Sequence, residues 1–526
     1  MTLQEEISRR RTFAIISHPD AGKTTLTEKF LLYGGAINLA GSVKGRKTAR
    51  HAVSDWMEIE KERGISVTSS VLQFQYDGKC VNILDTPGHQ DFSEDTYRTL
   101  MAADSAVMVI DASKGVEAQT IKLFKVCVMR HIPIFTFINK MDREAKDPFE
   151  LLDDIERVLG IATCPVNWPL SSGKTFRGIY ERDRAVITTF TAADAGQHAI
   201  ETQHLDPQAP STREKIGGQY MDRLADDLEM LDALAELDMD AVLRGEQSPV
   251  FFGSALTNFG VQTFLEHFLE MAPGPEPHLA GDQVIDPVQE PFSAFVFKIQ
   301  ANMNKAHRDR IAFMRICSGR YESGMEVNHV QGGRRIRLSQ STQMMAQERT
   351  IVEEAYAGDI IGVFDPGIFS IGDTLCLSDC TFAYEGIPTF APEHFARLRQ
   401  ADTMKRKQFL KGVNQIAQEG AIQIFQELNS GMEEIIVGVV GVLQFDVLMY
   451  RLKNEYNVEA RLDILPYGHI RWITSHTRPE SIQGTSDMKR VCDLKGEPLL
   501  LFVNSWSPGM VLERNPGLEL AEFGRG

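Results

Sequence analysis

Short apolar runs alternate with helical segments over the first half of the chain. The runs are rich in Val, Ile and Phe, which is typical of strands buried on both faces of a parallel sheet. They are Thr12–Ile16, Val71–Tyr76, Val81–Leu84, Ser105–Ile110, Ile134–Ile138 and Val250–Phe252. Segments of helical pattern, such as Thr25–Tyr33, separate them. This alternation predicts a doubly wound α/β domain over residues 1–276.

A long spacer interrupts the alternation before the last apolar run. It contains two strand-like pieces, Gly178–Tyr180 and Ala185–Phe190, and one helix-like piece, Leu224–Arg244. We interpret the spacer, around residues 160–248, as an insertion that forms a peripheral subdomain.

Prolines mark the end of the α/β domain. Pro273, Pro275 and Pro277 cannot extend the preceding helix, because proline lacks the backbone N–H and clashes with the previous turn. Short alternating segments separated by Gly and Asp turns follow, and they predict an antiparallel β-barrel domain over residues 277–390. These segments are Ser293–Ile299, Arg310–Ile316, Arg334–Ser339, Thr350–Glu354 and Ile360–Phe364.

The pattern changes again at Ala391. Phe395–Ala417 and Leu443–Leu452 have a helical pattern, and the strand-like Ile435–Val440 lies between them. Helices and strands in this order predict a C-terminal α+β sandwich domain over residues 391–526. Three domains agree with a length of 526 residues, at about 150 residues per domain.

A candidate phosphate-binding loop follows the first apolar run. It reads Ser17, His18, Pro19, Asp20, Ala21, Gly22, Lys23 and Thr24. A strand, a loop ending in glycine, Lys-Thr and a helix form the arrangement of P-loop NTPases, in which backbone N–H groups and the helix N-terminus face the phosphates. Lys23 would reach the β- and γ-phosphates and Thr24 would hold Mg²⁺. Ser17 replaces the first glycine of the pattern, so a surface turn stays the alternative for this stretch alone.

Two further motifs follow later strand-like runs. The first is Asp85, Thr86, Pro87, Gly88 and His89; the second is Asn139, Lys140, Met141 and Asp142. Ligands bind at the carboxyl ends of strands in open α/β sheets, which is where both motifs fall. Asp85 can hold Mg²⁺ through water, and the Gly88 N–H can bind the γ-phosphate. Asp142 can accept paired hydrogen bonds from the N1–H and 2-amino group of guanine, which adenine lacks.

Composition is that of a globular protein, with 43% hydrophobic and 24% charged residues. No apolar stretch approaches the roughly 20 residues of a membrane span, and we expect no membrane partner and a cytoplasmic location. The net charge of −17 argues against nucleic acid as a partner. Two basic clusters, Arg334–Arg337 and Phe395–Lys411, point the other way, with solvated surface as their alternative.

Together these motifs resemble the translational GTPases, and among them the bacterial class-II release factors. The resemblance is carried by residues 17–25, 63–68, 85–89, 139–142 and 439–447, and it covers essentially the whole chain. The chain lacks room for the two further domains of elongation factor G, and elongation factor Tu is shorter and has no large insertion.

The resemblance implies roles for four further residues. Ser254 and Ala255 would form the turn that backs the guanine. Ser66 would be the Mg²⁺ ligand of the first switch, where the family has threonine, with Thr68 as the fallback. His89 would position the attacking water for catalysis.

It also implies a function. The ligands would be GTP or GDP with Mg²⁺, and the main partner would be the ribosome, through its rRNA and proteins. With GTP bound, such a factor promotes departure of class-I release factors after peptide release, and hydrolysis allows its own departure. Nothing demands more than a monomer. Two alternatives stay open: a ribosomal GTPase of elongation or stress, and a GTP-gated binding protein that acts away from the ribosome.

Overall fold

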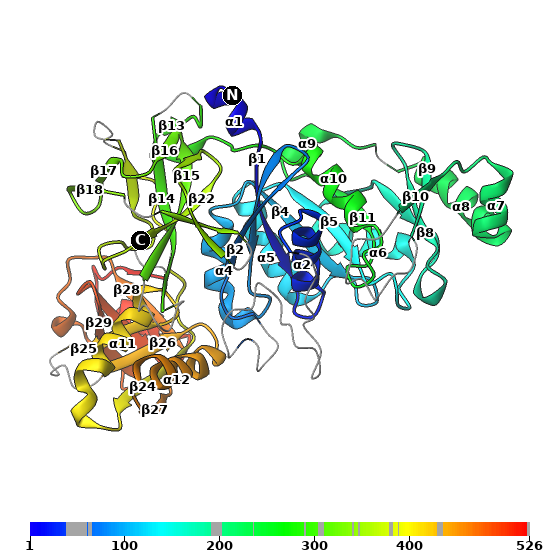
Figure 1. Ribbon diagram of the computed structural model, residues 1–526. Helices are drawn as coiled ribbons and strands as arrows, with labels where there is room; N and C mark the ends of the chain where they lie inside the picture. The colour runs from blue at the N-terminus through cyan, green and yellow to red at the C-terminus, as the bar shows by residue number, and fades with distance from the viewer. Residues whose placement is uncertain are drawn as a thin grey trace.

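The computed structural model places three domains in the order expected from the sequence (Figure 1). It describes residues 1–37, 60, 66–190, 202–234, 236–288, 291–302, 310–338, 341–345, 348–377, 382–387, 389–428 and 435–522. An α/β domain is followed by an antiparallel β domain and then by a domain of mixed helices and strands, which confirms the predicted fold class.

A seven-stranded sheet forms the centre of the α/β domain. Its order is β2 (Ser70–Tyr76), β3 (Lys79–Asp85), β1 (Arg10–Ser17), β4 (Ser105–Asp111), β5 (Ile134–Asn139), β11 (Gln247–Phe252) and β6 (Ala162–Pro165). The edge strand β2 runs antiparallel to β3, and the other neighbours are parallel. Every residue of β1 is buried, as the continuous apolar run predicts.

Helices cover both faces of this sheet, and successive residues of β1 serve opposite faces. Phe13 packs with α2 (Lys23–Tyr33) and α10 (Val261–Met271). Its neighbour Ala14 belongs to the other core, which contains α4 (Ser93–Leu100), α5 (Ala118–Met129) and α6 (Pro148–Leu159). The carboxyl ends of the strands therefore form one edge between two helical layers.

The insertion extends from one end of the α/β domain (Figure 1). Its antiparallel sheet has the order β10 (Thr202–Leu205), β9 (Val186–Phe190), β8 (Gly178–Glu181) and β7 (Asn167–Pro169). The helices α7 (Pro210–Ile216), α8 (Gly218–Leu231) and α9 (Met239–Leu243) follow.

One predicted helix of the insertion is wrong over part of its length. The pattern predicts a continuous helix over Leu224–Arg244, but α8 ends at Leu231 and α9 begins at Met239. The Asp238 side chain accepts hydrogen bonds from the N–H groups of Asp240 and Ala241, so it starts a new helix.

The second domain is built from antiparallel strands. The order of its larger sheet is β18 (Arg334–Arg337), β17 (Glu326–His329), β23 (Thr374–Cys376), β14 (Ser293–Ala301), β15 (Arg310–Ser318), β22 (Ile360–Phe364), β19 (Thr342–Met345) and β20 (Glu348–Ile351). The strands β16 (Arg320–Glu322) and β21 (Glu354–Tyr356) pair separately.

The third domain has one eight-stranded sheet, and here the sequence interpretation needs correction. The order is β27 (Ala460–Leu465), β24 (His394–Gln400), β26 (Ile435–Val439), β25 (Gln423–Glu427), β29 (Met488–Asp493), β30 (Pro498–Phe502), β28 (His469–Ile473) and β31 (Leu520–Ala521). Phe395–Ala417 is not one helix: β24 occupies its start, and α11 spans Arg406–Gln418. Pairing with β26 and β27 on both sides overrides the helical pattern of this segment.

Buried charges join the α/β domain to the second domain. Arg315 of β15 donates two hydrogen bonds to the Asp104 carboxylate, and both side chains are nearly inaccessible, at 1% and 3% exposure. Arg10 of β1 pairs with Asp359, and the Thr12 hydroxyl donates to the carbonyl of Gly358. These contacts fix the two domains against each other.

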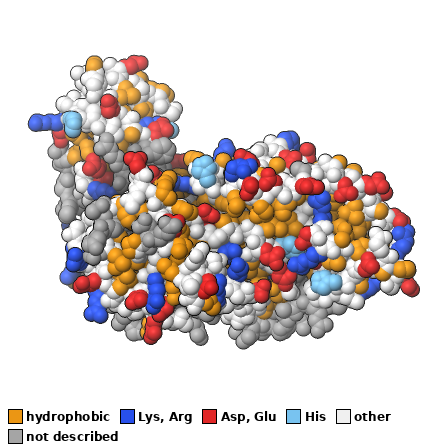
Figure 2. Space-filling view, turned by 90° about the horizontal axis from the view of Figure 1, so that it is seen from above, with side chains coloured by type: hydrophobic (Ala, Val, Ile, Leu, Met, Phe, Trp, Pro, Cys, Tyr) orange, Lys and Arg blue, Asp and Glu red, His pale blue; other side chains and the backbone are white. Residues whose placement is uncertain are grey.

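The molecular surface mixes charges of both signs. Acidic and basic side chains are interspersed over the face seen in Figure 2. None of the helices that the structure describes is long and apolar enough to cross a membrane.

The buried Asp104–Arg315 pair gives a test of the interface. Asp104→Ala leaves the Arg315 guanidinium buried without its carboxylate, so we expect the free energy of unfolding to fall by about 3–5 kcal/mol. Glu354→Ala is the matched control, because it removes a carboxylate from the exposed pair with Arg320 and should cost less than about 1 kcal/mol. Urea unfolding followed by circular dichroism measures both variants. Equal losses of unfolding free energy would contradict the view that the buried Asp104–Arg315 pair holds the two domains together.

Candidate nucleotide-binding site

The loop between β1 and α2 forms an open turn at the carboxyl edge of the sheet. Asp20 and Gly22 both adopt positive φ, at 67° and 100°, which curls the backbone before the helix. Gly22 is the N-cap of α2 and offers no side chain to cap the first helical N–H groups. A methyl group at Gly22 would overlap Nδ2 of Asn139, so the close approach of these two loops requires glycine.

The donor groups of this loop suit an anion. The first N–H groups of a helix have no partner within the helix, and the N-terminus carries partial positive charge. Among the described residues, buried Nδ1 of His18 has no hydrogen-bond partner, although Nε2 lies 3.4 Å from Glu117. The uncapped helix and the unpartnered imidazole nitrogen fit a bound phosphate chain.

Lys23 and Asp85 meet below the loop. The Lys23 ammonium group donates to Asp85 Oδ1, and their side chains are 6% and 2% exposed. Thr24 follows Lys23 in the first turn of α2 and is half-buried. An ammonium group, a hydroxyl and a carboxylate are the groups that bind phosphate and Mg²⁺, and here they come from the first turn of α2 and from the end of β3.

The motif that begins at Asp85 lies against the phosphate loop. The Thr86 hydroxyl donates to the carbonyl of Ile15 over 2.7 Å, which ties the motif to β1. A Cβ at Gly88 would contact the Pro19 backbone at 3.5 Å. Pro87 therefore lies between two anchored neighbours, and His89 follows at the mouth of the site with 31% of its side chain exposed.

Asn139 connects three loops through its side-chain amide. Nδ2 donates to the carbonyl of Ala21 over 2.9 Å, and Oδ1 accepts from the N–H groups of Lys140 and Ala255 over 2.8 Å each. The amide is buried and uses both ends. The Ala255 N–H thus supports Asn139 in this structure.

Lys140 has a partner that the sequence interpretation missed. Its ammonium group donates to the Asp20 carbonyl and lies 2.6 Å from Asp111 Oδ2. Burial alone would raise the pKa of Asp111, but hydrogen bonds from Lys140 and Ser113 outweigh burial and lower the pKa. Asp111 ends β4, and its place at the end of an apolar run is a sequence feature that could have identified it.

Asp142 faces the turn that follows β11. Ser254 Oγ donates to Asp142 Oδ1 over 2.5 Å, and the Met141 N–H donates to the carbonyl of Gly253 over 3.1 Å. Met141 is fully buried beneath the loop. The segment at Met141 and Asp142 and the turn after β11 are far apart in the sequence, and they lie together beside the phosphate loop.

The first-switch segment is only partly within the described residues. Arg63, Gly64 and Ile65 lie outside them, while Ser66 lies inside and is half-buried. Glu60 Oε1 accepts hydrogen bonds from the N–H groups of Val67 and Thr68, over 2.9 and 3.1 Å. The pairing of Ser66 with Thr24 around a metal ion stays a prediction.

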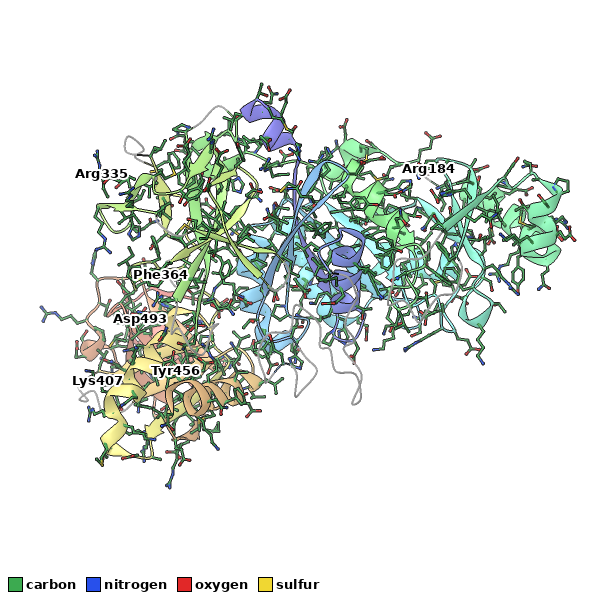
Figure 3. The ribbon with its side chains drawn as sticks, viewed as in Figure 1. Arg184, Arg335, Phe364, Lys407, Tyr456 and Asp493 are labelled. Carbon is green, nitrogen blue, oxygen red and sulfur yellow. The ribbon has the colours of Figure 1, made fainter. Side chains whose placement is uncertain are left out.

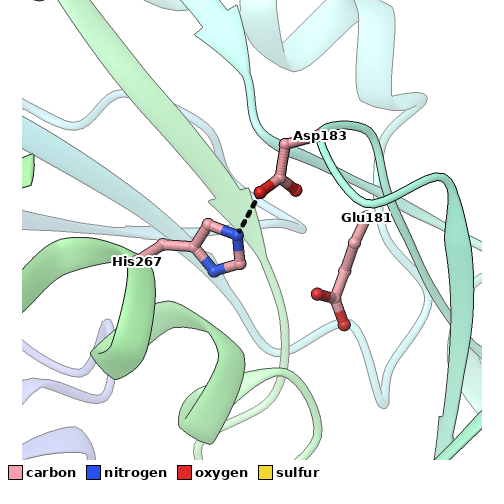
Figure 4. Close-up of side chains that lie close together, drawn as sticks. All are labelled: Glu181, Asp183 and His267. Atoms are coloured by element: carbon pink, nitrogen blue, oxygen red, sulfur yellow. Dashed lines mark hydrogen bonds and ion pairs between the residues drawn. The ribbon is translucent and has the colours of Figure 1, made fainter. Parts of the chain in front are cut away.

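One group outside this site, within the described ranges, lies close enough to share a metal ion. Ligand atoms of Glu181, Asp183 and His267 lie within 4.8 Å of one another (Figure 4). His267 Nε2 lies 3.0 Å from Asp183 Oδ2, and Arg184 Nη1 lies 3.4 Å from Glu181 Oε2. The guanidinium group also lies 3.9 Å from Asp183 Oδ2, so we interpret the group as an ion-pair network that fastens the insertion to α10.

Family models match each of the three domains. The elongation factor Tu GTP-binding domain matches residues 8–274, and elongation factor G domain 2 matches residues 291–378. The C-terminal domain of class II release factor RF3 matches residues 384–511.

Full-length relatives carry one name. Peptide chain release factor 3 of Symbiobacterium thermophilum is 60% identical over 519 residues, covering 98% of both chains. The protein of the same name from Gloeobacter violaceus is 52% identical and covers 99% of both chains. A crystal structure from Thermus thermophilus matches with a TM-score of 0.69 at 22% identity, over 92% of this chain and 72% of that one, which supports the fold alone.

The P-loop domain and its guanine-type motifs define a multidomain GTPase of the translational class. The full-length relatives and the match to the C-terminal domain then identify the family within this class. The chain belongs to the peptide chain release factor 3 family, GTPases of translation termination.

Gly22→Ala tests the packing of the phosphate loop. The methyl group would displace the Asn139 amide and would strain a left-handed backbone, so we expect GDP affinity to fall by at least about tenfold. Gly35→Ala is the control, because Gly35 has a φ of +67° beyond the other end of α2 and open space around it. Isothermal titration calorimetry measures both variants. Equal losses would show that backbone strain, and not the contact with Asn139, is responsible.

Proposed function

We propose that this chain is a ribosome-dependent GTPase whose GTP-bound form promotes the departure of class-I release factors after peptide release. GTP hydrolysis then allows its own departure. The observation that carries the proposal is the packing of the Asp85–His89 motif against the phosphate loop, through Thr86 and Gly88. A γ-phosphate held by that loop would touch both segments, so its loss would change how they pack.

The phosphate chain would lie along the backbone of Ser17–Thr24. The N–H groups of this loop and the start of α2 would donate to the phosphate oxygens. Lys23 would move its ammonium group from Asp85 toward the β- and γ-phosphates, and the Gly88 N–H would donate to the γ-phosphate.

Thr24, Ser66 and, through water, Asp85 would hold Mg²⁺. The ion supplies positive charge that neutralises the phosphate oxygens. Thr68 is the alternative to Ser66, because both carry a hydroxyl and are half-buried, and Glu60 holds the N–H of Thr68.

His89 would act on the water molecule that attacks the γ-phosphorus. The water oxygen forms the new bond as the bond to the β–γ bridging oxygen breaks, and GDP and inorganic phosphate leave. The imidazole orients the water and stabilises developing charge, more than it removes a proton.

Asp142 would select guanine by accepting from its N1–H and 2-amino groups. Ser254 already donates to one carboxylate oxygen, which holds the side chain in place beside the loop. Asn139, Lys140, Met141 and Ala255 would complete the base pocket through the contacts described above.

Two exposed basic clusters support contact with the ribosome. Arg334, Arg335 and Arg337 are exposed on β18, and Arg406, Lys407 and Lys411 lie on the third domain. Arg335 and Lys407 lie toward the end of the molecule opposite the insertion (Figure 3). Positive charge there would meet rRNA phosphates despite the net charge of −17. We propose a monomer, since all the proposed nucleotide ligands come from one chain, and a cytoplasmic location, since the proposed partner is the ribosome.

His89→Ala should remove ribosome-stimulated hydrolysis, because the imidazole that would orient the attacking water is lost. We expect kcat to fall by at least about hundredfold, with GDP affinity changed less than about twofold. His476→Ala, which removes an exposed histidine of the third domain, is the control. Phosphate release in the presence of ribosomes measures kcat. A parallel collapse of GDP affinity would remove His89 from the catalytic role.

Asp142→Asn should shift base preference from guanine toward xanthine. The paired acceptors become one acceptor and one donor, and xanthine offers a carbonyl where guanine has its amino group. Competition between GDP and XDP for binding measures the change. Unchanged preference for GDP would contradict the contact between Asp142 and the base.

A further inference from the structure

The second switch, which comprises the Asp85–His89 motif and the turn that follows it, is joined directly to the third domain at Asp91. Asp91 Oδ2 accepts the backbone N–H of Leu443 over 2.8 Å, at the start of α12 (Leu443–Tyr456). Gly441 approaches so closely that a Cβ there would overlap Asp91 Cγ. The carboxylate is 7% exposed, so the helix N-terminus covers it and complements its charge.

The same aspartate contacts the proposed catalytic histidine. The Asp91 N–H lies 3.3 Å from His89 Nδ1, and Asp91 Oδ1 lies 3.2 Å from the same nitrogen. A neutral ring that accepts the N–H at Nδ1 carries its proton on Nε2, whereas a protonated ring can donate from Nδ1 to Oδ1. Asp91 therefore engages Nδ1 in either charge state and leaves Nε2 as the nitrogen that can face substrate.

Phe92, the next residue, contacts the first switch, α12 and His89. It packs in a buried cluster with Val67 of the first switch and with Val447 of α12. Its ring also lies edge-on to the His89 imidazole, with the ring centroids 6.3 Å apart. The turn from His89 to Phe92 is therefore held from the third-domain side by a hydrogen bond and by apolar packing.

We propose that Asp91 is a positioning residue for GTP hydrolysis, through which docking of the α12 N-terminus sets the orientation of His89. When α12 withdraws, Asp91 loses the Leu443 N–H and its cover, and the histidine ring loses its fixed partner. Hydrolysis thus depends on the position of the third domain. The inference rests on the proposed function, since it requires His89 to act on the water.

Four variants test the contact from both domains. Asp91→Ala removes the carboxylate. Gly441→Ala displaces the carboxylate through a substitution in the third domain, so the sequence of the α/β domain stays unchanged. In both we expect kcat of ribosome-stimulated hydrolysis to fall by at least about tenfold, with KM for ribosomes and GDP affinity within about twofold of the parent. Asp91→Asn keeps an oxygen that accepts the Leu443 N–H, and it should retain kcat within about threefold. Val442→Ala changes an exposed neighbour of Gly441 and should leave kcat unchanged.

The double variant separates positioning from general damage. Asp91→Gly removes the Asp91 Cβ and carboxylate atoms that lie nearest to position 441, so adding Gly441→Ala to Asp91→Gly should cause no further loss of kcat. Independent, additive losses would contradict the proposal, as would a loss carried by KM or by GDP affinity. If Gly441→Ala does not fold, the contrast between Asp91→Ala and Asp91→Asn decides, because equal losses of kcat in these two would also contradict it.

His89→Ala in the same assay separates a failure of the proposed catalytic role of His89 from a failure of the positioning role of Asp91. If His89→Ala retains kcat, the proposed catalytic role fails, and the role of Asp91 fails with it. If His89→Ala loses kcat but Asp91→Ala and Gly441→Ala retain it, only the positioning role of Asp91 is overturned.

Discussion

The nucleotide site depends on the buried side-chain amide of Asn139. This one group donates a hydrogen bond to the Ala21 carbonyl of the phosphate loop. It also accepts hydrogen bonds from the N–H groups of Ala255 and of the next residue, Lys140. A buried amide is costly unless its donor and acceptor are both used, and here both are. The close fit with Gly22 follows from the same contact, since any side chain there would push the amide away. The site is therefore a set of loops whose spacing one side chain controls.

The two junctions that the α/β domain makes with the other domains differ in their physical character. The second domain is joined to the α/β domain by buried ion pairs and by hydrogen bonds to strand β1, such as Arg315–Asp104 and Arg10–Asp359. The third domain meets the second switch through a hydrogen bond at Asp91 and a small apolar cluster around Phe92. The buried Arg98 of α4 adds a hydrogen bond to the carbonyl of Gly420 in the third domain. The contacts at the second switch lie next to the γ-phosphate sensor, so they are suited to change with nucleotide state, whereas a network of buried charges is suited to stay fixed.

Sequence alone predicted the motifs of the site because each follows directly on its own strand. Asp85 and Asn139 end β3 and β5, and the parallel sheet brings such ends to one edge. The partner of Lys140 was missed, although Asp111 ends β4 in the same way. The assignments of catalysis, metal binding and base recognition to particular residues stay predictions.

The third domain was harder to predict. The local pattern of Phe395–Gln400 is helical, but two neighbouring strands pair with it, and pairing between distant segments leaves little trace in local periodicity. The role of Asp91 was likewise invisible, because Leu443 lies 352 residues away. Such contacts are set by the docking of domains and not by local sequence pattern.

In the function proposed above, ribosomes switch on hydrolysis at this site, and nucleotide state controls departure from a termination complex. The most direct measurement follows GTP hydrolysis and the dissociation of a fluorescent class-I release factor from post-release ribosomes in one reaction. We expect hydrolysis at least about hundredfold faster with ribosomes than without them. We also expect the class-I factor to leave with GTP or with a non-hydrolysable analogue, while departure of this protein itself requires hydrolysis. Hydrolysis unaffected by ribosomes, or a class-I factor that stays bound, would rule out this function.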